Sequence, residues 1–300
     1  MALKILKSTE PLEVKNIVVA IYSNPGIGKS TLGFTADKPI LLDFDGGAYR
    51  AANRGDSVQI SSWTDAGSIQ AEDIKGYNTV IIDTAGRALD YLAANIIKNN
   101  PKMGYGTALT LQGYGQLKSI FTGWLNAIKT MGKDVVLIAH SSEDKKGDEL
   151  IERLDIQGGS KQEVYKSSDA MGRLSIENGK RILNFSPTDT AFGKNPACLD
   201  PLEIPDTAVQ PDFLATVIAG IKNSLNAMTD EQKKRQNQIA DWQATISEKT
   251  TADEFTELIG IVTKVDAAIR QTVKGMLHKA ATEAGFDFDK ASKTYKAKAE

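Results

Sequence analysis

The sequence has very few residues that could form disulfides or metal clusters. Cys198 is its only cysteine, and two histidines occur among 300 residues. These counts exclude an intramolecular disulfide and a thiolate zinc cluster, and they argue against a histidine-rich metal site. Long apolar runs are also missing, since no stretch approaches the length of a transmembrane helix and the amino-terminal segment has no signal-peptide core. We therefore expect a soluble cytoplasmic protein with no membrane partner.

An excess of charge of either sign is missing too. The 36 lysines and arginines nearly balance the 38 aspartates and glutamates, which leaves a net charge of -2. This balance excludes a strongly basic nucleic-acid-binding protein but is compatible with a local cationic groove. The apolar fraction of 41% is enough for one large domain or two modest ones.

Short apolar runs alternate with helical patterns over the first 200 residues, which is typical of an α/β fold with a mostly parallel sheet. The spacing predicts strands over 17–22, 39–43, 79–83 and 134–139, and helices over 89–99 and 117–130. Shorter strand-like pieces follow between 150 and 186. There, Asn178-Gly179 predicts a tight hairpin turn.

The chain changes character after a proline-rich connector that runs from Pro187 to Pro211. Helical patterns then cover 212–228 and two further segments that open at the capping-box sequences 229–232 and 251–254. A last helix is expected to end near Gly285, before a lysine-rich tail. We therefore expect a core over 1–205 and a helical region over 206–300. A chain ending near Pro211 should fold and still bind nucleotide.

A glycine-rich segment directly follows the first apolar run. It consists of Ser23, Asn24, Pro25, Gly26, Ile27, Gly28, Lys29, Ser30 and Thr31. A strand, a glycine-rich turn and Lys-Ser form a phosphate loop, in which backbone N–H groups and Lys29 contact the phosphates and the Ser30 hydroxyl ligates Mg²⁺. Ser23 stands where the strict pattern has glycine, and its small side chain should still allow the loop to close. The segment predicts a nucleoside-triphosphate-binding protein.

Two carboxylates are candidates for the same site. Asp83 ends the most apolar predicted strand, where an acid holds Mg²⁺ opposite the loop hydroxyl. Asp45 follows the strand over 39–43, and alternation would place Asp43 and Asp45 on one side of it. A carboxylate there can deprotonate an attacking water, although Asp45-Gly46-Gly47 is equally compatible with a simple turn. Aspartate is one methylene shorter than the glutamate that often has this role, so we expect slow hydrolysis.

His140 comes immediately after the predicted strand 134–139. A polar side chain at that position can contact the γ-phosphate and report its loss to the next loop. The alternative is an ordinary structural histidine.

Together, these segments resemble the RecA-like ATPase core over roughly residues 15–195. The resemblance is carried by the phosphate loop, Asp43-Phe44-Asp45-Gly46-Gly47, Val80-Ile81-Ile82-Asp83 and the run 135–140 ending at His140. More narrowly, the chain resembles compact phage-encoded proteins with this core, some of which act in single-strand annealing or recombination. The resemblance implies ATP as the nucleotide, Mg²⁺ held by Ser30 and Asp83, a catalytic acid at Asp45 and a sensor at His140.

The resemblance also implies partners. RecA-like cores usually bind nucleotide between the subunits of a homo-oligomer, with a cation supplied in trans, for which Lys194, Arg181 and Arg173 are candidates. Single-stranded DNA would be bound by loops over 101–116 and 141–170, and the C-terminal helices could bind other recombination or replication proteins. The aromatic and cationic residues of these loops are Tyr105, Tyr114, Lys145, Lys146, Lys161 and Lys166. Acids are interleaved with these lysines, so the second loop is equally compatible with a solvated surface.

Two other interpretations remain open. Asp83-Thr84-Ala85-Gly86-Arg87 and Thr263-Lys264-Val265-Asp266 mimic motifs of signal-recognition-particle-type GTPases. The second motif, however, lies in a helical pattern far from the other motifs, where four-residue matches are common by chance. A nucleotide-binding scaffold that does not hydrolyse is the third possibility.

Overall fold

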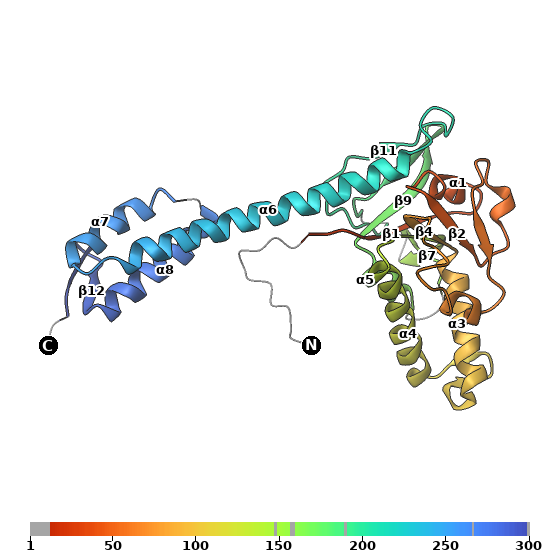
Figure 1. Cartoon of the computed structure of the whole chain (residues 1–300), viewed down its shortest axis with the longest axis horizontal. Coiled ribbons are helices and arrows are strands. Elements are labelled where there is room, and N and C mark those ends of the chain that lie inside the picture. The colour runs from red at the N-terminus through yellow and green to blue at the C-terminus, as the bar shows by residue number, and fades with distance from the viewer. Residues whose placement is uncertain (1–12, 147–148, 157–159, 189–190, 266, 299–300) are drawn as a thin grey trace. The chain divides into compact units, whose positions relative to one another are not determined.

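The structure is a computed structural model that describes residues 13–146, 149–156, 160–188, 191–265 and 267–298. It divides into two compact units, of which one covers Val14–Leu225 and the other contains Asn226–Glu300 (Figure 1). None of the described helices is long and apolar enough to cross a membrane.

The first unit is built on a mostly parallel sheet. Its parallel strands lie in the order β9 (Ala170–Glu177), β1 (Val18–Ser23), β7 (Asp134–Lys146), β4 (Thr79–Asp83), β2 (Pro39–Asp43) and β3 (Ser57–Gln59). Three further strands are antiparallel: β10 (Lys180–Asn184) pairs with β9, β11 (Leu202–Glu203) with β10, and β8 (Glu149–Leu154) with β7. The central strands read as continuous apolar runs because both of their faces are buried. This order places β7 between β1 and β4.

Helices cover both faces of the sheet. The helices of this unit are α1 (Lys29–Gly33), α2 (Trp63–Gly67), α3 (Ala85–Asn99), α4 (Leu111–Thr130), α5 (Ser160–Ser167) and the first part of α6 (Phe213–Ser247), with 3-10 turns at Ala48–Arg50 and Pro101–Met103. Val18 and Ala20 belong to the core under α3 and α4, whereas Val19 and Ile21 belong to the core under α1 and α6. The period-two alternation of β1 therefore contributes to both cores.

Most predicted elements are confirmed. Strands 39–43 and 79–83 have the predicted bounds, and Asn178 and Gly179 adopt φ values of 52° and 78° in the turn between β9 and β10. β7 is longer than expected, since it continues to Lys146 and pairs with β8. A small hairpin of β5 (Gly104–Tyr105) and β6 (Ala108–Leu109) connects α3 to α4.

The first unit ends at Leu225, whereas the sequence suggested a core that ends at residue 205. The first turns of α6 bury Leu214, Ile218 and Ile221 against the sheet. The Leu214 N–H donates to the Thr35 hydroxyl at 3.0 Å, and Lys222 pairs with Asp134 at 2.7 Å. Periodicity shows that a helix here is amphipathic, but it does not show which apolar surface the helix covers.

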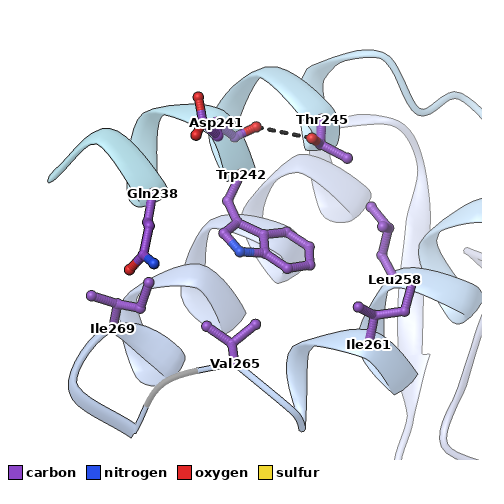
Figure 2. A pocket seen from close by; sticks show the side chains of 8 residues that line it. All are labelled: Gln238, Asp241, Trp242, Thr245, Leu258, Ile261, Val265 and Ile269. Carbon is purple, nitrogen blue, oxygen red and sulfur yellow. Dashed lines mark hydrogen bonds between the residues drawn. The ribbon is translucent and has the colours of Figure 1, made fainter. Parts of the chain in front are cut away.

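The second unit packs the distal part of α6 with α7 (Ala252–Val262), α8 (Ala267–Glu283) and a hairpin of β12 (Phe286–Asp289) and β13 (Thr294–Ala297). Its core includes Phe255, Val273 and Tyr295. A cavity of about 380 Å³ lies beside Trp242, whose ring faces Val265 (Figure 2).

One prediction for the second unit is wrong and two are confirmed. The capping box of Thr251 and Glu254 is present at the start of α7, and α8 ends at Glu283, just before Gly285. The break expected at Thr229 does not occur, because the sequence around it has no glycine or proline and α6 continues through it. The lysine-rich tail forms the β12–β13 hairpin, in which Phe286, Phe288 and Tyr295 supply the apolar side chains.

Candidate functional site

The phosphate loop connects the buried strand β1 to α1. Gly26 and Gly28 have φ values of 81° and 97°, which L side chains rarely adopt, so both positions require glycine. The Leu32 N–H donates to the Gly28 carbonyl at 2.9 Å, and the helix begins at Lys29. Gly28 is thus the turn residue from which the chain enters the helix. The loop has the backbone shape that a phosphate cradle requires.

The Lys29 side chain is folded back onto the loop. Its Nζ donates to the carbonyl oxygens of Ser23 and Asn24, both at 3.0 Å, and to the Ser23 hydroxyl at 3.1 Å. Burial lowers the pKa of Lys29 to about 8, because water no longer solvates the ammonium and the carboxylates of Asp83 and Asp45 compensate only in part. The ammonium is therefore charged at neutral pH and is held by weak neutral acceptors. Phosphate oxygens would bind it more strongly.

Ser30 and Asp83 form the expected hydroxyl–carboxylate pair. The Ser30 hydroxyl donates to Asp83 Oδ2 at 2.5 Å, and Asp83 is the last residue of β4. Burial raises the pKa of Asp83, an effect that the Ser30 hydrogen bond opposes. No group of three or more metal-ligating side chains occurs among the described residues. One carboxylate and one hydroxyl nevertheless fit Mg²⁺, which takes few protein ligands and completes its shell with water and phosphate oxygens.

The two aspartates near the end of β2 have different surroundings. Asp43 is buried, and its carboxylate accepts the N–H groups of Gly47 and Ala48 at 3.0 Å each. It therefore closes the turn in which Asp45 lies. Because β2 ends at Asp43, the alternation expected along the strand does not reach Asp45.

Both oxygens of the Asp45 carboxylate face arginines. Oδ2 lies 3.2 Å from Arg50 Nη2, and Oδ1 lies 3.6 Å from Arg87 Nε. The two arginine side chains are 59% exposed, so they are free to rearrange. The sequence patterns did not indicate that Arg50 and Arg87 would lie beside Asp45. Arg87 has a weak signal, since it lies one helical turn after Asp83.

His140 lies on β7, opposite Ser23 of β1 in the strand register. Its Nδ1 is 3.4 Å from Lys29 Nζ. Burial and the neighbouring ammonium lower the pKa of His140, so the ring is neutral at neutral pH and accepts from the lysine. The next residue, Ser141, donates from its hydroxyl to the Asn24 side chain at 2.8 Å. Strand β7 is thus joined to the phosphate loop by two side chains.

A cavity of about 320 Å³ brings these groups together. It is lined by Pro25, Gly26, Gly28, Lys29, Ser30, Thr31, Asp45, Gly47, Arg50, Ala51, Asp83 and His140. Three residues of the predicted loop do not line it. Ser23 is fully buried, Asn24 bonds to Ser141, and Ile27 packs against the core under α6.

The three candidate fingers differ in their surroundings. Arg173 pairs with Glu152 at 2.5 Å, and Lys194 donates to the Ser168 carbonyl at 2.5 Å. A Cβ added to Gly28 would lie 3.0 Å from Nη1 of Arg181. The Arg181 guanidinium therefore lies against the phosphate loop of its own chain, a position that sequence spacing could not reveal.

The guanine-reading motif of the GTPase interpretation lies elsewhere. Thr263, Lys264 and Val265 follow α7 in the second unit and end no strand of the sheet, while Asp266 lies outside the described residues. The motif is therefore not part of the cavity described above.

The strand order and the site define the class of protein. A phosphate loop after β1, an acid at the end of β4 and an intervening strand β7 characterise an α/β P-loop protein with a RecA-like core. The family model described as an AAA domain, AAA_24, matches residues 15–197, and the chain belongs to this family. Among solved structures, the crystal structure of the RadB recombinase is similar at 13% identity and a TM-score of 0.35, over 56% of this chain and 79% of that chain. A search of curated proteins finds no match.

Proposed function

We propose that this chain is a Mg²⁺-dependent ATPase that acts as an oligomer on single-stranded DNA, in phage recombination or strand annealing. The observation that carries the proposal is the shared cavity, in which Lys29, Ser30, Asp45, Asp83 and His140 meet. They come from four separate segments of the sequence. If the cavity had no ligand and these residues only supported the fold, each polar group would need a separate reason to lie there.

Triphosphate binding would begin with Lys29. Its ammonium would leave the carbonyl oxygens of Ser23 and Asn24 for the anionic phosphate oxygens, which are stronger acceptors. The Ser30 hydroxyl and the Asp83 carboxylate would hold Mg²⁺, which neutralises phosphate charge when bound. The glycine-rich loop supplies N–H donors around them.

Hydrolysis requires a base near the γ-phosphate, and Asp45 is the carboxylate available for it. Arg50 also lines the cavity, so a bound triphosphate would attract its guanidinium and release Asp45 Oδ2. That oxygen would take a proton from water while the water oxygen bonds to the γ-phosphorus. The bond from phosphorus to the β,γ-bridging oxygen then breaks, and ADP and phosphate leave.

The segment that follows His140 is the part of the chain best suited to single-stranded DNA. β7 continues past His140 into the hairpin with β8, so a change at the phosphate loop reaches the hairpin through one strand. Next to it, the exposed rings of Tyr165 and Phe192 lie 5.5 Å apart. Arg153 stacks on Phe192 at 4.3 Å. Aromatic rings beside cations bind unpaired bases and phosphates.

The other predicted DNA loop is less well placed. Tyr105 is 88% exposed on the β5–β6 hairpin, but Tyr114 packs against the core. Helix α3 has 15 residues and separates this hairpin from Asp83 by about 22 Å along its axis. Lys166 pairs with Glu163 at 4.0 Å, whereas the side chains of Lys145, Lys146 and Lys161 lie outside the described residues.

Phosphate release from ATP and GTP, measured with and without oligothymidine, tests the proposal. ATP hydrolysis that single-stranded DNA stimulates supports it. A preference for GTP would indicate a targeting switch, and binding without turnover would indicate a scaffold. Lys29→Ala should abolish nucleotide binding, whereas the matched control Lys264→Ala, in the second unit, should leave it unchanged.

Two further variants compare the DNA-binding loops. Phe192→Ala should weaken binding of oligothymidine by roughly tenfold, because base–aromatic stacking contributes about 1–3 kcal/mol per base. Tyr105→Ala, at a more exposed ring, should have less effect. The opposite ranking would move the DNA site to the β5–β6 hairpin. Gel-filtration mass with ATP and oligothymidine, together and separately, tests the oligomer.

A further inference from the structure

A second cavity of the C-terminal unit lies between α7, α8 and the β12–β13 hairpin, with a volume of about 640 Å³. Its inner wall is apolar and includes Ile259, the buried Val262 and the partly buried Phe288. This volume falls in the range of sites that hold a small ligand or an anchoring side chain.

The edge of this cavity is cationic. Arg270 and Lys274 come from α8, and Lys290 and Lys293 come from the turn between β12 and β13; all four are exposed. None of the four makes an ion pair with a described residue, and no described carboxylate lines the cavity. The nearby Asp289 is paired with Lys296 at 2.5 Å. We call the cavity and these four residues the cationic groove.

Folding explains only part of the cationic groove. The Arg270 guanidinium donates to the Val265 carbonyl oxygen from Nε at 3.0 Å and from Nη2 at 2.8 Å. Arg270 and Lys274 are four residues apart on α8, a spacing at which like charges destabilise a helix. The turn lysines add further positive charge to the same edge. An anionic ligand would remove this repulsion when it binds.

We propose that the cationic groove binds an acidic peptide segment of a partner protein. An apolar side chain of the segment occupies the cavity between Ile259 and Phe288, and its carboxylates pair with Arg270, Lys274 and Lys290. This site is separate from the nucleotide cavity and does not depend on the proposed ATPase function.

The surroundings of Phe288 favour a peptide over a nucleic acid. Its ring is flanked by His278 at 4.9 Å and by Tyr295 at 5.1 Å, and it is only partly exposed. Sequence-tolerant binding of single strands uses exposed aromatic faces on which bases stack. Aliphatic walls with surrounding cations instead complement an apolar anchor with flanking carboxylates.

Fluorescence anisotropy with the full chain tests this inference. The probe is a labelled peptide of alternating glutamate and aspartate with a central leucine–phenylalanine pair. Lys274→Glu and Lys290→Glu should each weaken its binding by about tenfold, because they replace attraction with repulsion. The matched control Lys279→Glu changes another exposed lysine of α8 that does not line the groove, and it should leave the affinity unchanged. Circular dichroism of each variant checks that it is folded.

Four outcomes would overturn the inference. The first is that the acidic peptide does not bind. The second is equal binding of a peptide in which alanines replace the leucine–phenylalanine pair, because the cavity would then hold no anchor. The third is an equal loss of affinity in Lys279→Glu. The fourth is unchanged affinity for the peptide in both Lys274→Glu and Lys290→Glu. If the peptide does not bind, loss of oligothymidine binding in Lys274→Glu would indicate a nucleic-acid site instead.

Discussion

The two units of the molecule differ in where they place polar groups. Every buried polar or charged residue among those that the structure describes lies in the first unit, and Lys29, Asp43 and Asp83 gather at one end of its sheet. The described core of the second unit is apolar, and its cations stand exposed around the cationic groove. Burying charge is costly unless the charge is paired. The difference agrees with the proposals made above, which place nucleotide chemistry in the first unit and peptide binding in the second.

The largest expected effect comes from shortening the chain at two different places, one within the first unit and one at its boundary. A chain that ends near Pro211 loses five buried residues of α6, namely Phe213, Leu214, Val217, Ile218 and Ile221. Each buried aliphatic or aromatic side chain contributes about 1.5–3 kcal/mol, so their loss removes most of a typical net stability of about 5–15 kcal/mol.

We therefore expect the chain ending near Pro211 to be insoluble or unfolded, and one ending at Leu225 to fold and bind ATP. Circular dichroism and thermal denaturation of both chains check this expectation. A stable, nucleotide-binding product from the shorter chain would restore the boundary that the sequence suggested.

The next effect concerns the two aspartates at the end of β2. Asp45→Asn should retain ATP binding and lose turnover by about 10²–10⁴-fold, the usual contribution of a general base. Asp43→Asn should instead lower stability, because its carboxylate accepts the N–H groups of Gly47 and Ala48. Phosphate release and thermal denaturation of both variants separate the roles. Unchanged hydrolysis in Asp45→Asn would remove its catalytic role.

A smaller effect is expected from pH. The proposed binding of triphosphate needs the Lys29 ammonium, and burial lowers the pKa of Lys29 to about 8. Affinity for a non-hydrolysable ATP analogue should be constant below that value and fall as the pH rises through it, by at most about tenfold per pH unit. His140, whose pKa is lowered, is already neutral in this range. Titration calorimetry checks the profile, and Lys29→Arg, which stays charged, should not show the fall.

The smallest effect belongs to the second unit. Thr251→Ala removes the hydroxyl that accepts the Glu254 N–H at the start of α7. The expected loss is about 1 kcal/mol in the free energy of unfolding, with no change in ATP affinity. Urea denaturation measures it, with Thr245→Ala as the control, because Thr245 is exposed on α6 and its hydroxyl donates to the Asp241 carbonyl within the same helix. A change in nucleotide binding would show that the two units are coupled.

The sequence by itself determined most of the elements around the candidate site. The phosphate loop, Asp83 at the end of β4 and the Asn178-Gly179 turn all follow from local spacing, because glycine conformation and strand alternation are properties of neighbouring residues. Only the tertiary structure decided which polar groups meet. The contacts of Arg87 with Asp45, Ser141 with Asn24 and Arg181 with Gly28 join segments far apart in the chain.

The same distinction explains the boundary of the first unit. The sequence of an amphipathic helix indicates that one face must be buried. It does not indicate which surface of the protein will cover that face, because this depends on tertiary packing. The first turns of α6 cover the sheet beside α1, whereas its distal turns belong to the second unit, and one continuous helical pattern contains both. The helical backbone sets the spacing of the apolar residues along α6. The surface that each apolar face covers is set by which apolar surfaces elsewhere in the fold would otherwise stay exposed.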